Sequence, residues 1–201
     1  MGEFLGFVHL GFRHIVNPEA LDHILFLLAL AAIYQGRNWK SSLWVISAFT
    51  VGHSMTLALA ATGKILIPQR LTEFLIPLTI VATGLQNIRA PAPERATSSR
   101  RYRPLFAGVF GLFHGAGFAS YLQRLFLGPV LVPLFGFNLG IELGQVVVLA
   151  VAGVVLLGLD RLLSIRRGLG TATSRFQLRV VMVSVVVIAI ATEMAVARRP
   201  W

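Results

Sequence analysis

The chain has 201 residues, of which 56% are hydrophobic and 13% charged, and its mean hydropathy is +0.76. Soluble domains carry nearer a quarter charged residues, so this composition excludes an ordinary soluble protein and indicates an integral membrane protein. The formal charge is +10, but the basic residues lie between apolar runs and do not form one soluble face, which argues against nucleic-acid binding.

The first element in chain order is a short apolar stretch, residues 3–16, which we interpret as an interfacial or re-entrant helix. It has neither a basic n-region nor a small-residue cleavage site, so we expect no cleavable signal. Six longer apolar runs follow, and a helix needs about 20 residues to cross a bilayer. They cover residues 18–35, 42–62, 72–89, 104–122, 130–158 and 177–197. The sequence therefore predicts an all-α fold, a polytopic membrane helical bundle of about six spans in a single domain, residues 1–201.

The joints between these runs are short and polar. Asn17 followed by Pro18 predicts an N-cap and a first-turn proline at the start of the first long run. Residues 90–104 (APAPERATSSRRYRP) form the clearest linker. Twelve of the eighteen Lys and Arg residues lie at joints one, three and five. Because cytoplasmic loops carry the basic excess, we expect these joints inside, both termini outward, and the protein in the bacterial inner membrane.

Small residues recur at helical spacing in two of the runs. Gly136, Gly140 and Gly144 lie one per turn in the fifth run, and Gly111, Gly115 and Ala119 do so in the fourth. Such stripes let membrane helices approach closely. They predict packing faces, toward neighbouring helices, another membrane protein or a second copy of the chain.

Several polar residues lie within the apolar runs. Asp22 and His23 stand about one turn inside the first run, His53 near the middle of the second and His114 near the middle of the fourth. Glu73 opens the third run. The fifth carries three polar residues three or four apart, on roughly one helical face: Asn138, Glu142 and Gln145.

Each of these residues also has a structural interpretation. A single membrane histidine commonly donates an interhelical hydrogen bond, a neutral Glu142 can do the same, and Asn138 and Gln145 can join helices. Glu73 lies near a span end, where a solvated acid is ordinary. Burying all of them without a common purpose would be expensive.

A divalent cation would turn these groups into a coordination shell. No cysteine is present, so thiolate ligands and disulfides are excluded. Imidazole and oxygen ligands suit nickel, cobalt or zinc better than cuprous ion. Asp22 can orient a histidine through its second ring nitrogen, as metal sites commonly require. The combination favours a metal site.

Five segments of the chain resemble the HupE/UreJ family of membrane proteins associated with hydrogenase and urease maturation. They are GFRHIVNPEALDHILFLLAL, AFTVGHSMTLALA, TEFLIPLTIVATGLQNI, FGLFHGAGFAS and FNLGIELGQ, in that order. The family is regarded as secondary transporters of nickel or cobalt. The resemblance implies that His14, Asp22 and His23 belong to the metal motif, with His53, His114 and Glu142 as further candidates.

The motif departs from the family's better-known pattern in one respect. That pattern places a glycine before Asp-His and five residues between the first histidine and the aspartate, whereas seven residues separate His14 from Asp22 here. The resemblance therefore carries Asp22 and His23 over more directly than His14.

The predicted function is transport of a divalent transition metal for metalloenzyme maturation. Nickel is the expected metal, with cobalt as the alternative. In this hypothesis His14, Asp22, His23 and Glu73 collect the ion at the outer mouth. His53, His114 and Glu142 hold it near the midplane, supported by Asn138 and Gln145. No GxxxxGK[ST] motif occurs in the sequence, so we expect passive, ion-coupled or partner-driven transport.

Two other functions remain open at the level of sequence. One is an intramembrane zinc-dependent hydrolase in which Ser54 or Ser120 helps to polarise the substrate. The other is a non-catalytic membrane subunit whose polar groups join helices or dock a partner.

Overall fold

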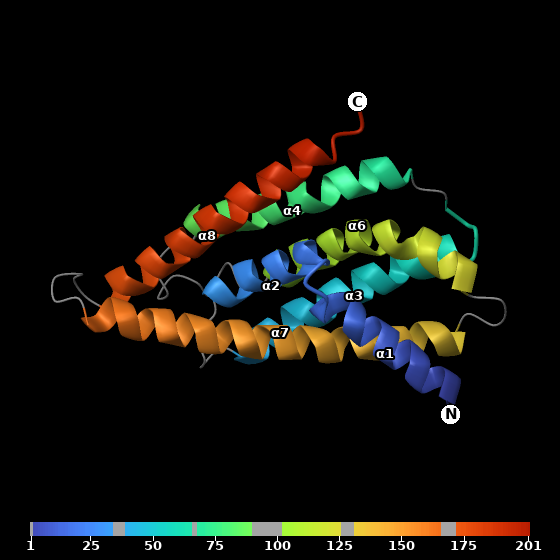
Figure 1. The fold of residues 1–201 in the computed structure, drawn as a ribbon, viewed down its shortest axis with the longest axis horizontal. Coiled ribbons are helices and arrows are strands. Elements are labelled where there is room, and N and C mark those ends of the chain that lie inside the picture. Colours follow the sequence, from blue (N-terminus) through green and yellow to red (C-terminus); the bar gives the residue numbers. More distant parts are fainter. Residues whose placement is uncertain (1, 34–38, 66–67, 90–101, 126–130, 166–171) are drawn as a thin grey trace.

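A computed structural model describes residues 2–33, 39–65, 68–89, 102–125, 131–165 and 172–201. All regular structure within these ranges is helical, which confirms the predicted all-α fold. The helices are α1 (Gly2–Val16), α2 (Leu21–Ile33), α3 (Trp39–Ala61), α4 (Gln69–Arg89), α6 (Tyr102–Leu125), α7 (Leu131–Ile165) and α8 (Ala172–Ala197). They form an elongated bundle, and both ends of the chain lie at the same end of it (Figure 1).

Within the described residues, four or five helices are long and apolar enough to cross a membrane, compared with the six spans that the sequence predicted. Four of the described helices, α3, α4, α7 and α8, are each long and apolar enough to cross a membrane, and α1 with α2 can form a fifth, bent span. Helix α6 is 24 residues long, but its side chains are described only as far as Phe118, so it is not among the helices counted. The count of six is therefore not confirmed, although a helix lies over each of the six predicted runs.

Helices α1 and α2 meet at an angle of 70°. Asn17 does not cap α2 as predicted, because α2 begins only at Leu21. Instead the Asn17 side-chain oxygen accepts a hydrogen bond from the Glu19 backbone N–H at 3.1 Å, an Asx turn. Pro18 lacks an N–H and cannot continue α1. The chain thus breaks between two helices at a partly exposed turn, Asn17 to Ala20.

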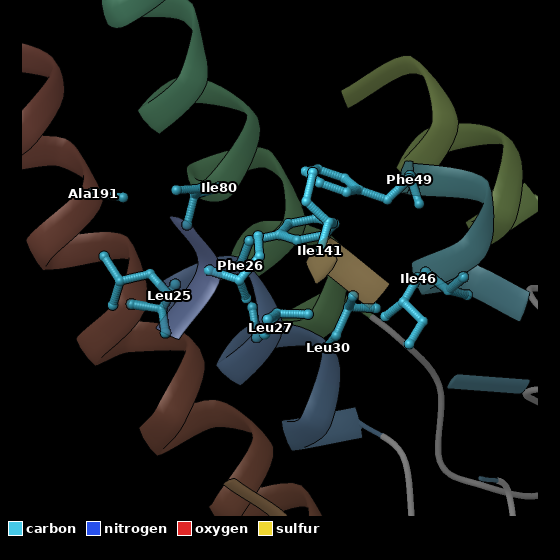
Figure 2. Packing of buried hydrophobic residues seen from close by; sticks show 14 of the residues in the cluster. Leu25, Phe26, Leu27, Leu30, Ile46, Phe49, Ile80, Ile141 and Ala191 are labelled. Carbon is cyan, nitrogen blue, oxygen red and sulfur yellow. The ribbon is translucent and has the colours of Figure 1, made fainter. Parts of the chain in front are cut away.

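Helix α2 lies at the centre of the bundle. It contacts α4, α7 and α8, and its residues from Leu25 to Leu27 and Ala29 to Ala32 are all buried. Figure 2 shows its apolar side chains between those of α3, α4, α7 and α8. A helix that is hydrophobic all round belongs inside a bundle. Its first turn, with Asp22 and His23, is therefore held within the protein and not on its surface.

The other end of α2 is held by polar side chains of neighbouring helices. The Asn87 side-chain amide donates to the Ala29 carbonyl at 2.7 Å, and the Arg179 guanidinium donates to the Ala32 carbonyl at 3.2 Å. Arg179 also forms an ion pair with Asp160 of α7. The Ala32 carbonyl is one of those that the last turn of a helix leaves without a partner, and together the two bonds anchor α2 at its end away from Asp22.

The two glycine stripes pack inside the chain. A Cβ on Gly140 would lie 2.0 Å from the Val8 carbonyl oxygen, and one on Gly115 would lie 2.1 Å from the His53 carbonyl oxygen. Helix α1 therefore lies directly on α7, and α3 directly on α6. The side-chain surroundings of Ala119 lie outside the described residues. Both predicted packing faces are taken up by helices of the same chain.

This close packing predicts unequal effects of two glycine substitutions in α7. Gly140→Ala should destabilise the folded protein by about 1–3 kcal/mol, because α1 must move away. Gly158→Ala in the same helix meets nothing within 4 Å and should be neutral or mildly stabilising. Thermal unfolding of the two purified variants in detergent compares them. Equal midpoints would contradict the close contact of α1 with α7.

Candidate metal centre

The break between α1 and α2 brings two histidines together. His14 lies in the last turn of α1 and His23 in the first turn of α2, and their ring centroids are 4.7 Å apart. The seven residues between His14 and Asp22 end one helix, make the turn at Asn17 and start the next. The longer spacing that sets this chain apart from the better-known pattern is thus spanned by the turn.

His53 joins this pair from the middle of α3. Its ring centroid is 6.1 Å from that of His14 and 6.5 Å from that of His23. One ring nitrogen of each of the three residues lies within 4.8 Å of the others, a group that could hold a metal ion. The His53 side chain is fully buried, so this group lies in the interior of the bundle.

His114 of α6 completes a cluster of four histidines from four helices. Its ring centroid is 5.2 Å from that of His23, and its Nε2 lies 3.4 Å from the hydroxyl oxygen of Thr79 in α4. It lies outside the group of three whose nitrogens are mutually close. We name His14, His23, His53 and His114 the imidazole cluster.

Five ring nitrogens of the imidazole cluster are buried and have no hydrogen-bond partner: His14 Nε2, His23 Nε2, both nitrogens of His53, and His114 Nδ1. A buried polar group without a partner costs about 1–3 kcal/mol. Helix-joining histidines would use these atoms for hydrogen bonds. A bound cation would give several of them a partner at once, because neutral imidazole is a common ligand of first-row metals.

Asp22 sets the orientation of His23. Its Oδ1 accepts hydrogen bonds from the His23 backbone N–H at 2.9 Å and from His23 Nδ1 at 3.0 Å. Since a carboxylate only accepts, Nδ1 carries the hydrogen, and the lone pair of Nε2 is free for the cluster. Its other oxygen, Oδ2, lies 3.4 Å from the Arg198 guanidinium. This is the carboxylate–histidine arrangement typical of metal ligands.

Phenylalanine rings surround the imidazole cluster. Phe118 lies 4.1 Å from His14 and Phe49 lies 4.9 Å from His114, both measured between ring centroids. The Phe137 ring is stacked on His53 at 6.4 Å. These rings keep water away from most of the cluster, which strengthens electrostatic interactions there.

A cavity of about 360 Å³ reaches the cluster from one side. Its polar lining comes from His14, Asp22, His23, Glu73, His114 and Arg198. A second, more open cavity of about 680 Å³ reaches His14 from the side of α1. The smaller cavity joins three histidines to two carboxylates, so it offers a polar approach through an apolar bundle.

Comparison with known proteins agrees with the metal-site chemistry of this cluster. A family model described as "HupE / UreJ protein" matches residues 1–198, which include the four histidines of the imidazole cluster. The chain belongs to the HupE/UreJ family. No curated protein and no solved structure matches the chain.

Membership of the HupE/UreJ family, together with the apolar helices, makes the chain a multi-pass membrane protein. It indicates an accessory membrane protein that handles nickel or cobalt. HupE/UreJ is a transporter and accessory family and not a known enzyme family.

The structure does not separate an outer group of predicted residues from a midplane group. His14 and His23 lie against His53 and His114, because the turn between α1 and α2 places them beside these residues of α3 and α6. Glu73 lines the smaller cavity and accepts a hydrogen bond from Gln69 at 2.7 Å. It thus remains beside the cluster without joining it.

The predicted residues of α7 lie apart from the group of three histidines. Glu142 is half-buried and lines neither of the two cavities. Gln145 is buried and accepts a hydrogen bond from the Thr50 hydroxyl at 3.1 Å, which joins α7 to α3. The Asn138 side-chain oxygen is buried without a partner. The face of α7 toward the bundle therefore carries Gln145, while Glu142 is not part of the group of three histidines.

Sequence reasoning missed Thr79, Arg198 and the phenylalanine rings. A threonine in an apolar run and an arginine after the last run are ordinary features of membrane helices. Arg198 is 176 residues from Asp22 in the sequence, and no local pattern relates the two. The phenylalanines are indistinguishable in sequence from other apolar residues of their runs.

Proposed function

We propose that this HupE/UreJ protein carries a divalent transition metal, most of all nickel, across the bacterial inner membrane to supply metalloenzyme maturation. The observation that supports this most is the set of five buried ring nitrogens without a partner, next to a cavity lined by carboxylates. Packing alone gives no reason to bury so many unsatisfied acceptors and donors together.

The proposed ligands are His14, His23 and His53. Metal–nitrogen bonds of 2.0–2.1 Å place two ligands of a tetrahedral ion roughly 3.3 Å apart, closer than the 4.8 Å limit within which these nitrogens lie. Small rotations of the rings would therefore accompany binding. His114 stands next to His23 as a further ligand, and Glu142, Asn138 and Gln145 remain predicted contributors from α7.

The broken helix supports transport more than permanent storage. Ion sites of secondary transporters are commonly formed where a membrane helix is interrupted, since the break frees backbone and side chains to meet the ion. Imidazole and carboxylate ligands without thiolate bind nickel firmly enough to replace water and weakly enough to release it. The turn between α1 and α2 is such an interruption, and His14, Asp22 and His23 lie on either side of it.

The side from which the ion enters follows from the predicted orientation. Glu73 and Arg198 of the smaller cavity lie near the start of α4 and just after the end of α8, at the same end of the bundle as both termini (Figure 1). With both termini outward, this cavity faces the exterior. The ion would enter there and meet Asp22 and His23 first.

The test compares metal bound by the wild type with that bound by a triple variant, His23→Ala, His53→Ala and His114→Ala. Both proteins are purified in detergent without a histidine tag and offered nickel, cobalt and zinc at equal concentrations. Elemental mass spectrometry should find exchangeable nickel in the wild type only. Proteoliposomes containing the wild type should take up nickel, and those with the triple variant should not.

Other outcomes of this experiment favour other functions. Equal metal contents in the two proteins would mean that the histidines only join helices, and would favour a non-catalytic membrane subunit. Tight, stoichiometric zinc without uptake would favour the intramembrane hydrolase. Against the hydrolase, the Ser54 hydroxyl donates to the Thr50 carbonyl of its own helix at 2.6 Å, and the side chain of Ser120 lies outside the described residues.

A further inference from the structure

Arg198 occupies an unusual position for a positively charged residue, because it lies beside the proposed metal site. It follows the end of α8 and lines the cavity of about 360 Å³ together with His14, His23 and His114. Its guanidinium lies 3.4 Å from Asp22 Oδ2, and about a third of its side chain is exposed. A positive charge at this place repels an arriving divalent cation.

The segment Arg198–Trp201 is attached to the bundle at two points. On the side of α8, the Arg198 backbone N–H donates to the Met194 carbonyl at 3.0 Å. On the side of α4, the Trp201 ring packs edge-on against Phe74 with centroids 5.3 Å apart. The segment therefore runs from α8 to α4, beside the cavity that Glu73 and Arg198 both line.

Asp22 connects this arginine to the imidazole cluster. One carboxylate oxygen holds His23 and the other faces Arg198. A metal ion on His23 Nε2 would draw the Asp22 charge toward His23 and repel the guanidinium. Without an ion, the guanidinium balances the Asp22 charge, which would otherwise be buried alone at high cost. Ion and arginine thus compete for one carboxylate.

We propose that Arg198 is a tethered counter-cation that neutralises Asp22 while the metal site is empty and is displaced when a divalent cation enters. The Arg198 side chain restricts access to the cavity in the empty state and moves aside as the ion pair breaks. The inference rests on the proposed metal transport for the identity of the ion. The restriction of access can be measured without any metal.

The absence of native cysteine allows a direct measurement of access. Ala20→Cys places a single thiol on the cavity wall, and its labelling by methyl methanethiosulfonate, a small neutral reagent, is timed in the full chain without metal. Adding Arg198→Ala should speed labelling about fivefold, as expected for the loss of an exposed ion pair. Adding Arg199→Ala, the exposed neighbour with the same charge, should leave the rate unchanged. Equal rates in the two double variants overturn the proposal.

Nickel affinity tests the competition itself. In the purified full chain, Arg198→Ala should bind Ni²⁺ about fivefold more tightly than Arg199→Ala, and Arg198→Lys, which keeps the charge, should stay close to wild type. A merely structural role for Arg198 would weaken binding when it is removed. Unchanged or weaker binding in Arg198→Ala overturns the proposal even if labelling accelerates.

The two experiments separate this inference from the proposed function. If the wild type and the triple histidine variant bind the same amount of metal, the transport proposal fails. The labelling ratio then still decides whether Arg198 restricts access to the cavity. If nickel binds only to the wild type and the labelling rates are equal, the transport proposal stands and the role of Arg198 is overturned.

Discussion

Replacing His53 by alanine should lower nickel affinity more than about 100-fold and abolish nickel uptake into proteoliposomes. Loss of a residue that only supports a metal ligand already costs 10–100-fold, and His53 is one of the three histidines whose nitrogens lie within 4.8 Å of one another. Titration of the purified protein with Ni²⁺ measures the affinity. His9→Ala, which removes an exposed histidine of α1, should bind as the wild type does.

The same position separates a metal role from a packing role in the metal-free protein. His53 has no hydrogen bond to lose and lies between Phe49 and Phe137. His53→Phe should therefore leave thermal stability in EDTA unchanged or raise it, because an unpaired polar group is replaced by an apolar ring. A fall of the unfolding free energy by more than about 3 kcal/mol, which a larger ring can cost in a packed core, would show that His53 forms a bond in the folded protein and would contradict the metal role.

Replacing Asp22 by asparagine should weaken nickel binding by about 10–100-fold while the protein still folds. Asparagine keeps the side-chain shape and one acceptor for His23, but it removes the charge that favours a hydrogen on Nδ1 and a free lone pair on Nε2. Ni²⁺ titration and uptake into proteoliposomes measure the loss. Glu193→Gln, a matched change of an exposed acid on α8, serves as the control.

The outcome of the Asp22 experiment also bears on the imidazole cluster. Unchanged affinity in Asp22→Asn would mean that His23 is oriented by its surroundings alone and that Asp22 acts only on Arg198. A loss confined to Asp22→Asn, with Glu193→Gln unaffected, would favour the carboxylate–histidine pair as part of the site. The hydrogen bond of Asp22 with His23 and its ion pair with Arg198 would thus give different results.

Composition and periodicity determined the fold class. Because lipid cannot satisfy backbone polar groups, apolar runs of this length must form helices, and the described part of the chain is helical over all six runs. The glycine stripes were also local enough to predict, since a face without side chains on one helix can meet a partner closely. The spacing predicted that Gly140 and Gly115 lie on packing faces. It did not predict the partners, which are Val8 of α1 and His53 of α3.

The chemical character of the candidate site was also readable from the sequence, because a buried histidine or acid is expensive in a membrane. Its geometry was not. Position along a run gave depth only under the assumption of straight helices, so Asp22 and His23 were expected near an outer mouth. Pro18 and the Asx turn at Asn17 bend the chain by 70°, and this bend brings His14 and His23 to His53.

What the sequence by itself determined was therefore the class of protein, the helices and the kind of ligand atoms available. What only the tertiary structure decided was which of those atoms meet. The four histidines come from four helices, and Arg198 reaches Asp22 across 176 residues. Such contacts depend on helix bends and on which faces pack together, and these are properties of the whole bundle that no local pattern encodes.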